Sequence, residues 1–143
     1  MIWPQNCDDQ FMSDESASAK SQKSAYLTAA LLGGSGVLHF AIPGPYDTIV
    51  PHALPGEARQ WTYLSGVAEL AIAGGLLMPR TRKPAALAAV GLLLGVFPAN
   101  IQMTVDWMSD PRKSKPLKAA SIARLPLQIP MITTALKAYR NAP

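Results

Sequence analysis

Charged residues are scarce in this chain of 143 residues, in which Asp, Glu, Lys and Arg together make up 15%. An ordinary soluble domain carries about 25%. Apolar residues make up 49% of the chain and are gathered into four blocks rather than spread evenly. This combination favours a membrane protein over a soluble helical bundle, and the length leaves room for one domain.

Cysteine and histidine are almost absent. The single cysteine, Cys7, excludes an intrachain disulfide and a CxxC pair, and with them thiol–disulfide chemistry carried by this chain alone. The two histidines, His39 and His52, show no His-x-x-His or Cys-rich spacing. We therefore expect no metal centre, and we expect His39 to form hydrogen bonds rather than to ligate haem.

The net charge of +4 could suggest a nucleic-acid-binding protein. However, the basic residues form short clusters beside the apolar blocks, such as Arg80, Arg82 and Lys83, as membrane-anchoring residues do. The sequence also has no phosphate-binding loop and no nucleophile paired with a base. We expect no nucleic-acid partner and no hydrolase or phosphoryl-transfer activity. No complete catalytic set is present, so it is uncertain whether the chain is an enzyme.

Residues 1–23 are rich in serine, aspartate and glutamine, which predicts a disordered polar tail. They lack the basic start of a secretory signal peptide. Met12 is an alternative to Met1 as the first residue, and the sequence leaves both open. The remaining residues, 24–143, are predicted to form a transmembrane domain.

Each apolar block is long enough for a helix across the roughly 30 Å hydrocarbon core of a bilayer, at about 1.5 Å per residue. The predicted helices cover about 24–42, 61–79, 84–105 and 117–139. The predicted fold class is therefore all-α, a four-transmembrane-helix bundle. Lysine and arginine slightly favour the side that holds both termini, so the positive-inside rule places the termini in the cytoplasm.

Small residues and prolines predict how these helices pack. Gly91 and Gly95 form a GxxxG pair, and we expect this face to pack tightly on another helix. Gly34 and Gly36 should likewise let a neighbouring helix come close to the first one. Pro98 removes one backbone hydrogen bond and should kink the third helix.

Each predicted helix carries a polar or ionisable residue inside its apolar stretch. Counted from one face of the membrane, His39, Glu69, Asn100 and Arg124 lie at depths of roughly 5, 12, 8 and 10 Å, and Gln128 lies nearer the midplane. These five residues are the candidate ligand-binding site, a polar pocket between the helices. A buried carboxylate and a buried guanidinium are costly when unpaired, so we expect a Glu69–Arg124 ion pair. The same residues could instead form a structural network that fixes helix pairing.

Five motifs carry a family resemblance: GVLHF (36–40), IVPHALP (49–55), WTYLSGVAEL…GGLLMPRTRKPAA (61–86), VFPANIQM (96–103) and RLPLQIP (124–130). Together they resemble the DoxX-like family of small four-helix bacterial membrane proteins over about 36–130. The resemblance implies a multi-pass protein of the bacterial inner membrane. The family's namesake is similar to a small subunit of a thiosulfate:quinone oxidoreductase, and relatives are described as partners in membrane oxidoreductase complexes. A quinone is therefore the candidate ligand, and the resemblance singles out the same five residues.

Two functions remain open from the sequence. The first is a redox-linked membrane subunit whose polar pocket holds a quinone or another amphipathic small molecule. The alternative is a non-enzymatic scaffold or assembly subunit of a membrane complex. In both cases the expected partners are membrane lipids and other membrane subunits or further copies of this chain. Solute transport is less favoured, because the chain shows no internal repeat.

Overall fold

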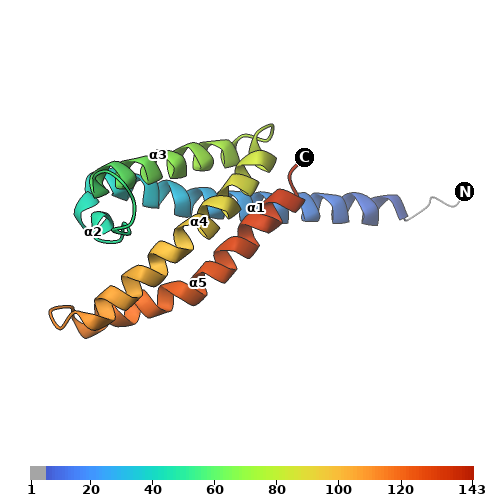
Figure 1. Ribbon diagram of the computed structural model, residues 1–143. Coiled ribbons are helices and arrows are strands. Elements are labelled where there is room, and N and C mark those ends of the chain that lie inside the picture. The colour runs from blue at the N-terminus through green and yellow to red at the C-terminus, as the bar shows by residue number, and fades with distance from the viewer. Residues whose placement is uncertain (1–5) are drawn as a thin grey trace, which may run out of the picture.

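Five helices and no strand occur in the part of the chain that the structure describes (Figure 1). The computed structural model describes the backbone of residues 6–143 and the side chains of residues 23–143. The helices are α1 (Asn6–Ala41), α2 (Pro43–Asp47), α3 (Ala58–Leu77), α4 (Arg82–Ser109) and α5 (Lys115–Arg140). The predicted all-α class is confirmed.

All four predicted segments are helical, but the helices begin and end at residues that differ from the predicted ones. Helix α1 begins at Asn6, so it extends into the segment predicted to be a disordered tail. Residues 1–5 of that segment lie outside the described residues, and the disorder of the tail stays a prediction. The short helix α2 was not predicted. It begins at Pro43, because proline has the fixed φ angle of a first helical turn and needs no hydrogen-bond acceptor there.

Length and hydropathy mark only α4, among the helices that the structure describes, as a candidate membrane span. One such helix is weak evidence for a membrane protein, because a core helix of a soluble protein can meet the same criterion. The four-span bundle is not supported by this criterion and stays a prediction.

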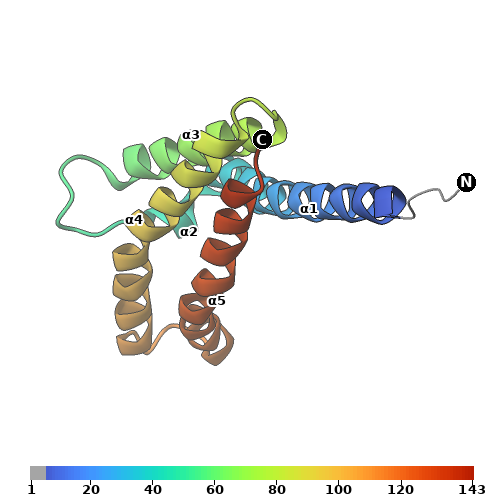
Figure 2. The same ribbon diagram turned by 90° about the vertical axis from the view of Figure 1, so that its right-hand side faces the viewer.

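The four long helices form two antiparallel pairs, α1 with α3 and α4 with α5 (Figures 1 and 2). The pairs meet at one end of the molecule, where small side chains allow close contact. This core consists of Ala25, Ala29, Leu32, Ala73, Leu76, Ala85, Ala86, Ala89, Ala135 and Ala138. Toward the end that carries α2, the α4–α5 pair diverges from the α1–α3 pair (Figure 1). The fold is thus closely packed at one end and splayed at the other.

Two glycines set the closest approach between α1 and α3. A Cβ atom built on Gly66 would lie 2.8 Å from both His39 Cβ and Phe40 Cε2, and one built on Gly36 would lie 2.9 Å from Leu70 Cγ. Only glycine permits these distances without a shift of the neighbouring atoms. The predicted close contact is confirmed at Gly36 and is wrong at Gly34, where a Cβ atom would meet nothing within 4 Å in the described chain.

The predicted GxxxG contact in α4 is wrong within the described chain. A Cβ atom on Gly91 or Gly95 would meet nothing within 4 Å. Helix α4 instead turns its Ala85, Ala89 and Leu93 side toward the bundle, and these three side chains are buried. Because they follow one another at four-residue spacing, they define a helix face that leaves Gly91 exposed.

Substituting Gly66 with alanine is expected to lower the free energy of unfolding by about 2 kcal/mol, because the new methyl group would overlap His39 and Phe40. Gly74→Ala, on the same helix, is the matched control. It adds a methyl group where nothing lies within 4 Å, so it should be neutral or stabilising by about 0.5–1 kcal/mol. Unfolding of both variants in detergent micelles measures the difference, and equal stability would contradict the close helix crossing.

Candidate functional site

A cavity of about 500 Å³ lies between the two diverging helix pairs, beside α2 and the connection that follows it. Its wall is mostly apolar. All four long helices contribute ionisable or hydrogen-bonding side chains to this wall, namely His39, Thr62, Ser65, Glu69, Asn100 and Arg124. The aromatic side chains of Tyr46 and Trp61 also line the cavity. The volume and the mixture of an apolar wall with a few polar groups are those of small-molecule sites, which span about 300–1,000 Å³.

The structure brings four of the five predicted site residues to this cavity, namely His39, Glu69, Asn100 and Arg124. Gln128 lies behind the wall. Its Oε1 accepts a hydrogen bond from Asn100 Nδ2 at 3.4 Å, and its Nε2 donates to the Leu93 carbonyl oxygen. Gln128 therefore joins α5 to α4 and positions Asn100, instead of lining the cavity.

Glu69 is paired with His39, and the predicted Glu69–Arg124 ion pair is wrong. His39 Nδ1 lies 3.4 Å from Glu69 Oε2, whereas no described nitrogen of Arg124 lies within ion-pair distance of the carboxylate. The reason is the helix pairing: α3 packs along α1, and the close crossing at Gly66 brings the two side chains together. Arg124 lines the same cavity from α5.

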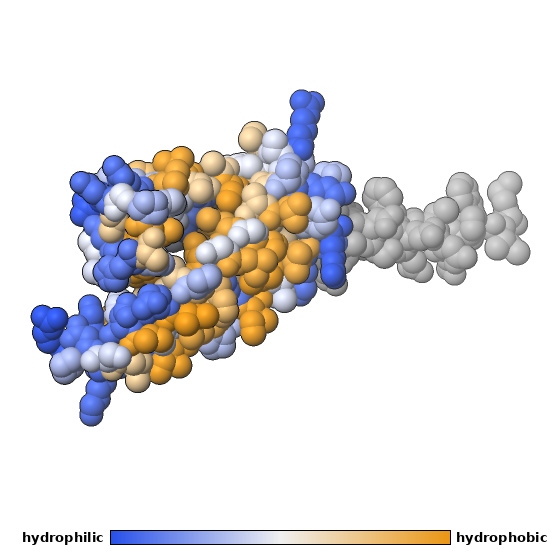
Figure 3. Space-filling model, in the orientation of Figure 1, coloured by the Kyte–Doolittle hydropathy of each residue, from blue (hydrophilic) through white to orange (hydrophobic). Residues whose placement is uncertain are grey.

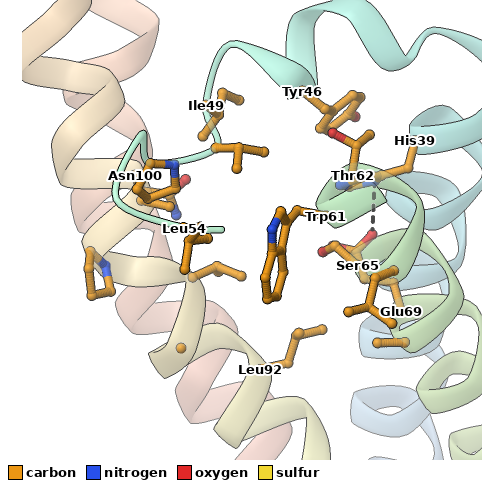
Figure 4. Close-up of a pocket in the computed structure, with 18 of the residues that line it drawn as sticks. His39, Tyr46, Ile49, Leu54, Trp61, Thr62, Ser65, Glu69, Leu92 and Asn100 are labelled. Carbon is orange, nitrogen blue, oxygen red and sulfur yellow. Dashed lines mark ion pairs between the residues drawn. The ribbon is translucent and has the colours of Figure 1, made fainter. Parts of the chain in front are cut away.

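The Glu69 carboxylate has an unused hydrogen-bonding atom. Glu69 is only 8% exposed, and its Oε2 is buried and accepts no hydrogen bond from the described residues. A buried polar atom without a partner costs about 1–3 kcal/mol, so natural proteins rarely keep one without a reason. Figure 4 shows Glu69 and His39 facing each other on one side of the cavity, with Asn100 on the opposite side. Glu69 thus lines the cavity while its Oε2 atom is covered by the protein beside His39.

Two aromatic side chains shape the cavity in a way that the sequence did not reveal. Trp61 Nε1 donates to the Pro55 carbonyl oxygen at 2.8 Å, and the indole lies between the two sides of the cavity (Figure 4). The Tyr46 ring lies against the His39 ring, with 3.9 Å between centroids. The connection 43–60 is rich in proline, but this feature of the sequence does not specify which side chains line a cavity.

Asp47 fastens α2 to the start of α3. Its carboxylate accepts hydrogen bonds from Thr62 Oγ1 at 2.7 Å and from Arg59 Nε at 2.8 Å. These bonds, chiefly that from Thr62, hold the pKa of Asp47 below its usual value. Since Tyr46 and Thr62 both line the cavity, this contact fixes one edge of the site.

Asp47 predicts an acid-dependent loss of stability. Because the pKa of Asp47 is lowered on folding, its ionised form stabilises the fold above the ordinary aspartate pKa of about 3.9, and this contribution is lost as the pH falls through the lowered value. The stability difference between wild type and Asp47→Asn should be constant from about pH 7 to 5 and shrink below about pH 4. Thermal unfolding across this range measures it, and a difference that is as large at pH 3 as at pH 7 would contradict the contact.

The structure thus defines a helical bundle with a mostly apolar cavity at its splayed end, into which a few polar side chains project. A family model described as "Domain of unknown function (DUF8561)" matches residues 28–139, and the chain belongs to this family. The matched region includes the cavity residues of all four long helices. No curated protein and no solved structure matches the chain. Among the described residues, no group of three or more His, Cys, Asp or Glu side chains could hold a metal ion.

Proposed function

We propose that this protein is a DoxX-like integral membrane protein, whose cavity binds a quinone-like amphipathic small molecule within a redox-linked membrane complex. The four long helices would cross the bacterial inner membrane, with both termini in the cytoplasm. The observation that carries the proposal is the cavity, in which the His39–Glu69 pair and Arg124 border a mostly apolar space.

The surface supports the membrane part of this proposal. A broad apolar band lies between two hydrophilic ends in the view of Figure 3. Large apolar side chains are exposed on all four long helices, among them Leu27, Leu31, Val37, Leu64, Val67, Leu77, Leu87, Leu94, Ile101, Val105, Ile122, Leu127 and Ile129. Soluble monomers rarely expose so much contiguous apolar surface, whereas a lipid-facing surface requires it.

Extraction of isolated membranes with alkaline carbonate tests the membrane assignment. The full chain should stay in the membrane pellet and dissolve only in detergent. Release into the carbonate wash would contradict an integral membrane protein.

The choice of a quinone rests on the site chemistry together with the resemblance to the DoxX-like family. The flat Trp61 ring and the apolar wall suit an aromatic ring, and Glu69 supplies a polar contact. Titrating the purified protein with a short-chain benzoquinone–benzoquinol pair should quench tryptophan fluorescence in a saturable way. The quenching should be largely lost in Trp61→Phe, and unsaturable quenching that survives in this variant would contradict binding in the cavity.

A scaffold role is the second candidate, and one observation favours it. The Gly91 face of α4 packs against nothing in the described chain, although small residues at four-residue spacing let membrane helices associate. A helix of another subunit or of a second copy would fit there. Under this proposal, Gly91→Leu should abolish co-purification of a partner and leave the cavity intact. Unchanged co-purification would count against it.

A further inference from the structure

We infer that the closely packed end of the bundle binds the phosphate head group of an anionic phospholipid. The binding surface lies where α4 begins beside the end of α5, and it shares no residue with the cavity. The inference goes beyond the proposed ligand cavity and rests only on the membrane part of the proposed function, because the helices must cross a bilayer for a phospholipid to reach this surface.

Three exposed basic side chains form the head-group part of this surface: Lys83, Lys137 and Arg140. Lys83 Nζ lies 5.6 Å from the centre of the Tyr139 ring, so the first turn of α4 lies beside the last turn of α5. Lys137 and Arg140 are three residues apart and therefore lie on the same side of α5. The three positive charges thus come from two neighbouring helix ends.

This end of the bundle lacks negative charge. The segments that build it contain no aspartate or glutamate between residues 70 and 105 or between residues 111 and 143. Within the described chain, none of the three basic residues takes part in an ion pair. At the splayed end, in contrast, Arg59 and Arg112 each pair with an aspartate. The positive charge at the closely packed end is therefore left for an anionic partner.

An apolar strip on α4 follows the basic residues. Leu87 and Leu94 come four and eleven residues after Lys83, spacings that place all three on one side of the helix. The two leucines are 54% and 57% exposed. An acyl chain can lie along them while the phosphate group meets Lys83. A free phosphate ion or a nucleic acid would use the charges and leave this strip uncovered, so a phospholipid fits the whole surface better.

The tyrosines at this end are those expected at the level of lipid head groups. Tyr139 lies under Lys83, and Tyr26 of α1 lies under Arg82. Tyrosine is enriched where a membrane meets water, because its ring is apolar and its hydroxyl group is polar. Each basic side chain near an anionic membrane surface raises affinity by about fivefold.

Phosphatidylglycerol and phosphatidylcholine with identical acyl chains are the probes. Their affinities are measured by native mass spectrometry of the full-length protein in a neutral detergent. Phosphatidylglycerol should bind roughly ten- to thirtyfold more tightly, as expected when two basic side chains meet one anionic head group. The full chain keeps the acidic residues Asp8, Asp9, Asp14 and Glu15, so any competition from them is included. The wild-type comparison needs no variant, so it holds even if a substitution impairs folding.

A triple variant locates the surface: Lys83→Gln, Lys137→Gln and Arg140→Gln. It should bring the ratio of the two lipid affinities close to one. The matched control changes the net charge equally in the connection between α4 and α5, at the splayed end: Arg112→Gln, Lys113→Gln and Lys115→Gln. The control should keep the wild-type ratio.

Four results would overturn the inference. They are equal binding of the two lipids by the wild type, a preference that survives in the first triple variant, an equal loss in both triple variants, and displacement of phosphatidylglycerol by an equal concentration of inorganic phosphate. None of them contradicts the proposed membrane assignment or the ligand cavity. Release of the chain by alkaline carbonate, in contrast, would contradict the membrane assignment whatever the lipid preference.

Discussion

Replacing Arg82 with methionine is expected to lower the free energy of unfolding by about 3 kcal/mol. Arg82 is only 4% exposed, and its guanidinium group caps the C-terminal end of α3. Its Nε donates to the Leu76 carbonyl oxygen at 2.8 Å, and its Nη2 donates to the Leu77 carbonyl oxygen at 3.3 Å. Methionine fills a similar space but leaves both carbonyl groups without this donor, and an unpaired buried polar group costs about 1–3 kcal/mol.

The same arginine also places its charge at the negative end of the helix dipole of α3. Its guanidinium carbon, Cζ, lies 5.7 Å from the centre of the Tyr26 ring. It thus connects α1, α3 and α4 at the closely packed end of the bundle. Arg80→Met is the matched control, because Arg80 is exposed and should change stability by less than about 0.5 kcal/mol. Denaturation in mixed detergent micelles measures both. Similar losses in the two variants would contradict the capping role.

Replacing Ala99 with tryptophan is expected to weaken the binding of a decyl-chain benzoquinol by at least about a hundredfold. Ala99 lines the cavity on α4, next to Asn100, and is partly buried. A tryptophan side chain there would occupy the space next to Trp61 that the ligand needs. Affinity should fall because binding would require the new side chain to leave the cavity.

Ala88→Trp is the control for this substitution. Ala88 is exposed on the same helix and is not among the cavity residues. Both variants should remain folded, as judged by gel filtration and circular dichroism, and only Ala99→Trp should lose binding. Unchanged affinity in Ala99→Trp would place the ligand elsewhere on the molecule.

The helical class was predictable because its signals are local. The lengths of the apolar blocks and the prolines that separate them are read directly along the chain. The rise per residue also gave the common depth of His39, Glu69, Asn100 and Arg124, which the structure does gather around one cavity.

The partners of these residues were not predictable in the same way. Depth along a helix says nothing about its rotation or its neighbours, so Glu69 was assigned to Arg124 although α3 packs along α1 and Glu69 lies beside His39. Arg82 was taken as a basic residue flanking a span, because only the tertiary structure brings it to the end of α3.

Mass spectrometry of the native protein after gentle detergent extraction, with identification of any released small molecule, tests the ligand cavity most directly. We expect about one amphipathic molecule with a phenolic or quinone ring per chain in the wild type, and none in Ala99→Trp. Wild-type protein without any such molecule, which also fails to take one up when it is supplied, would contradict the proposed ligand site.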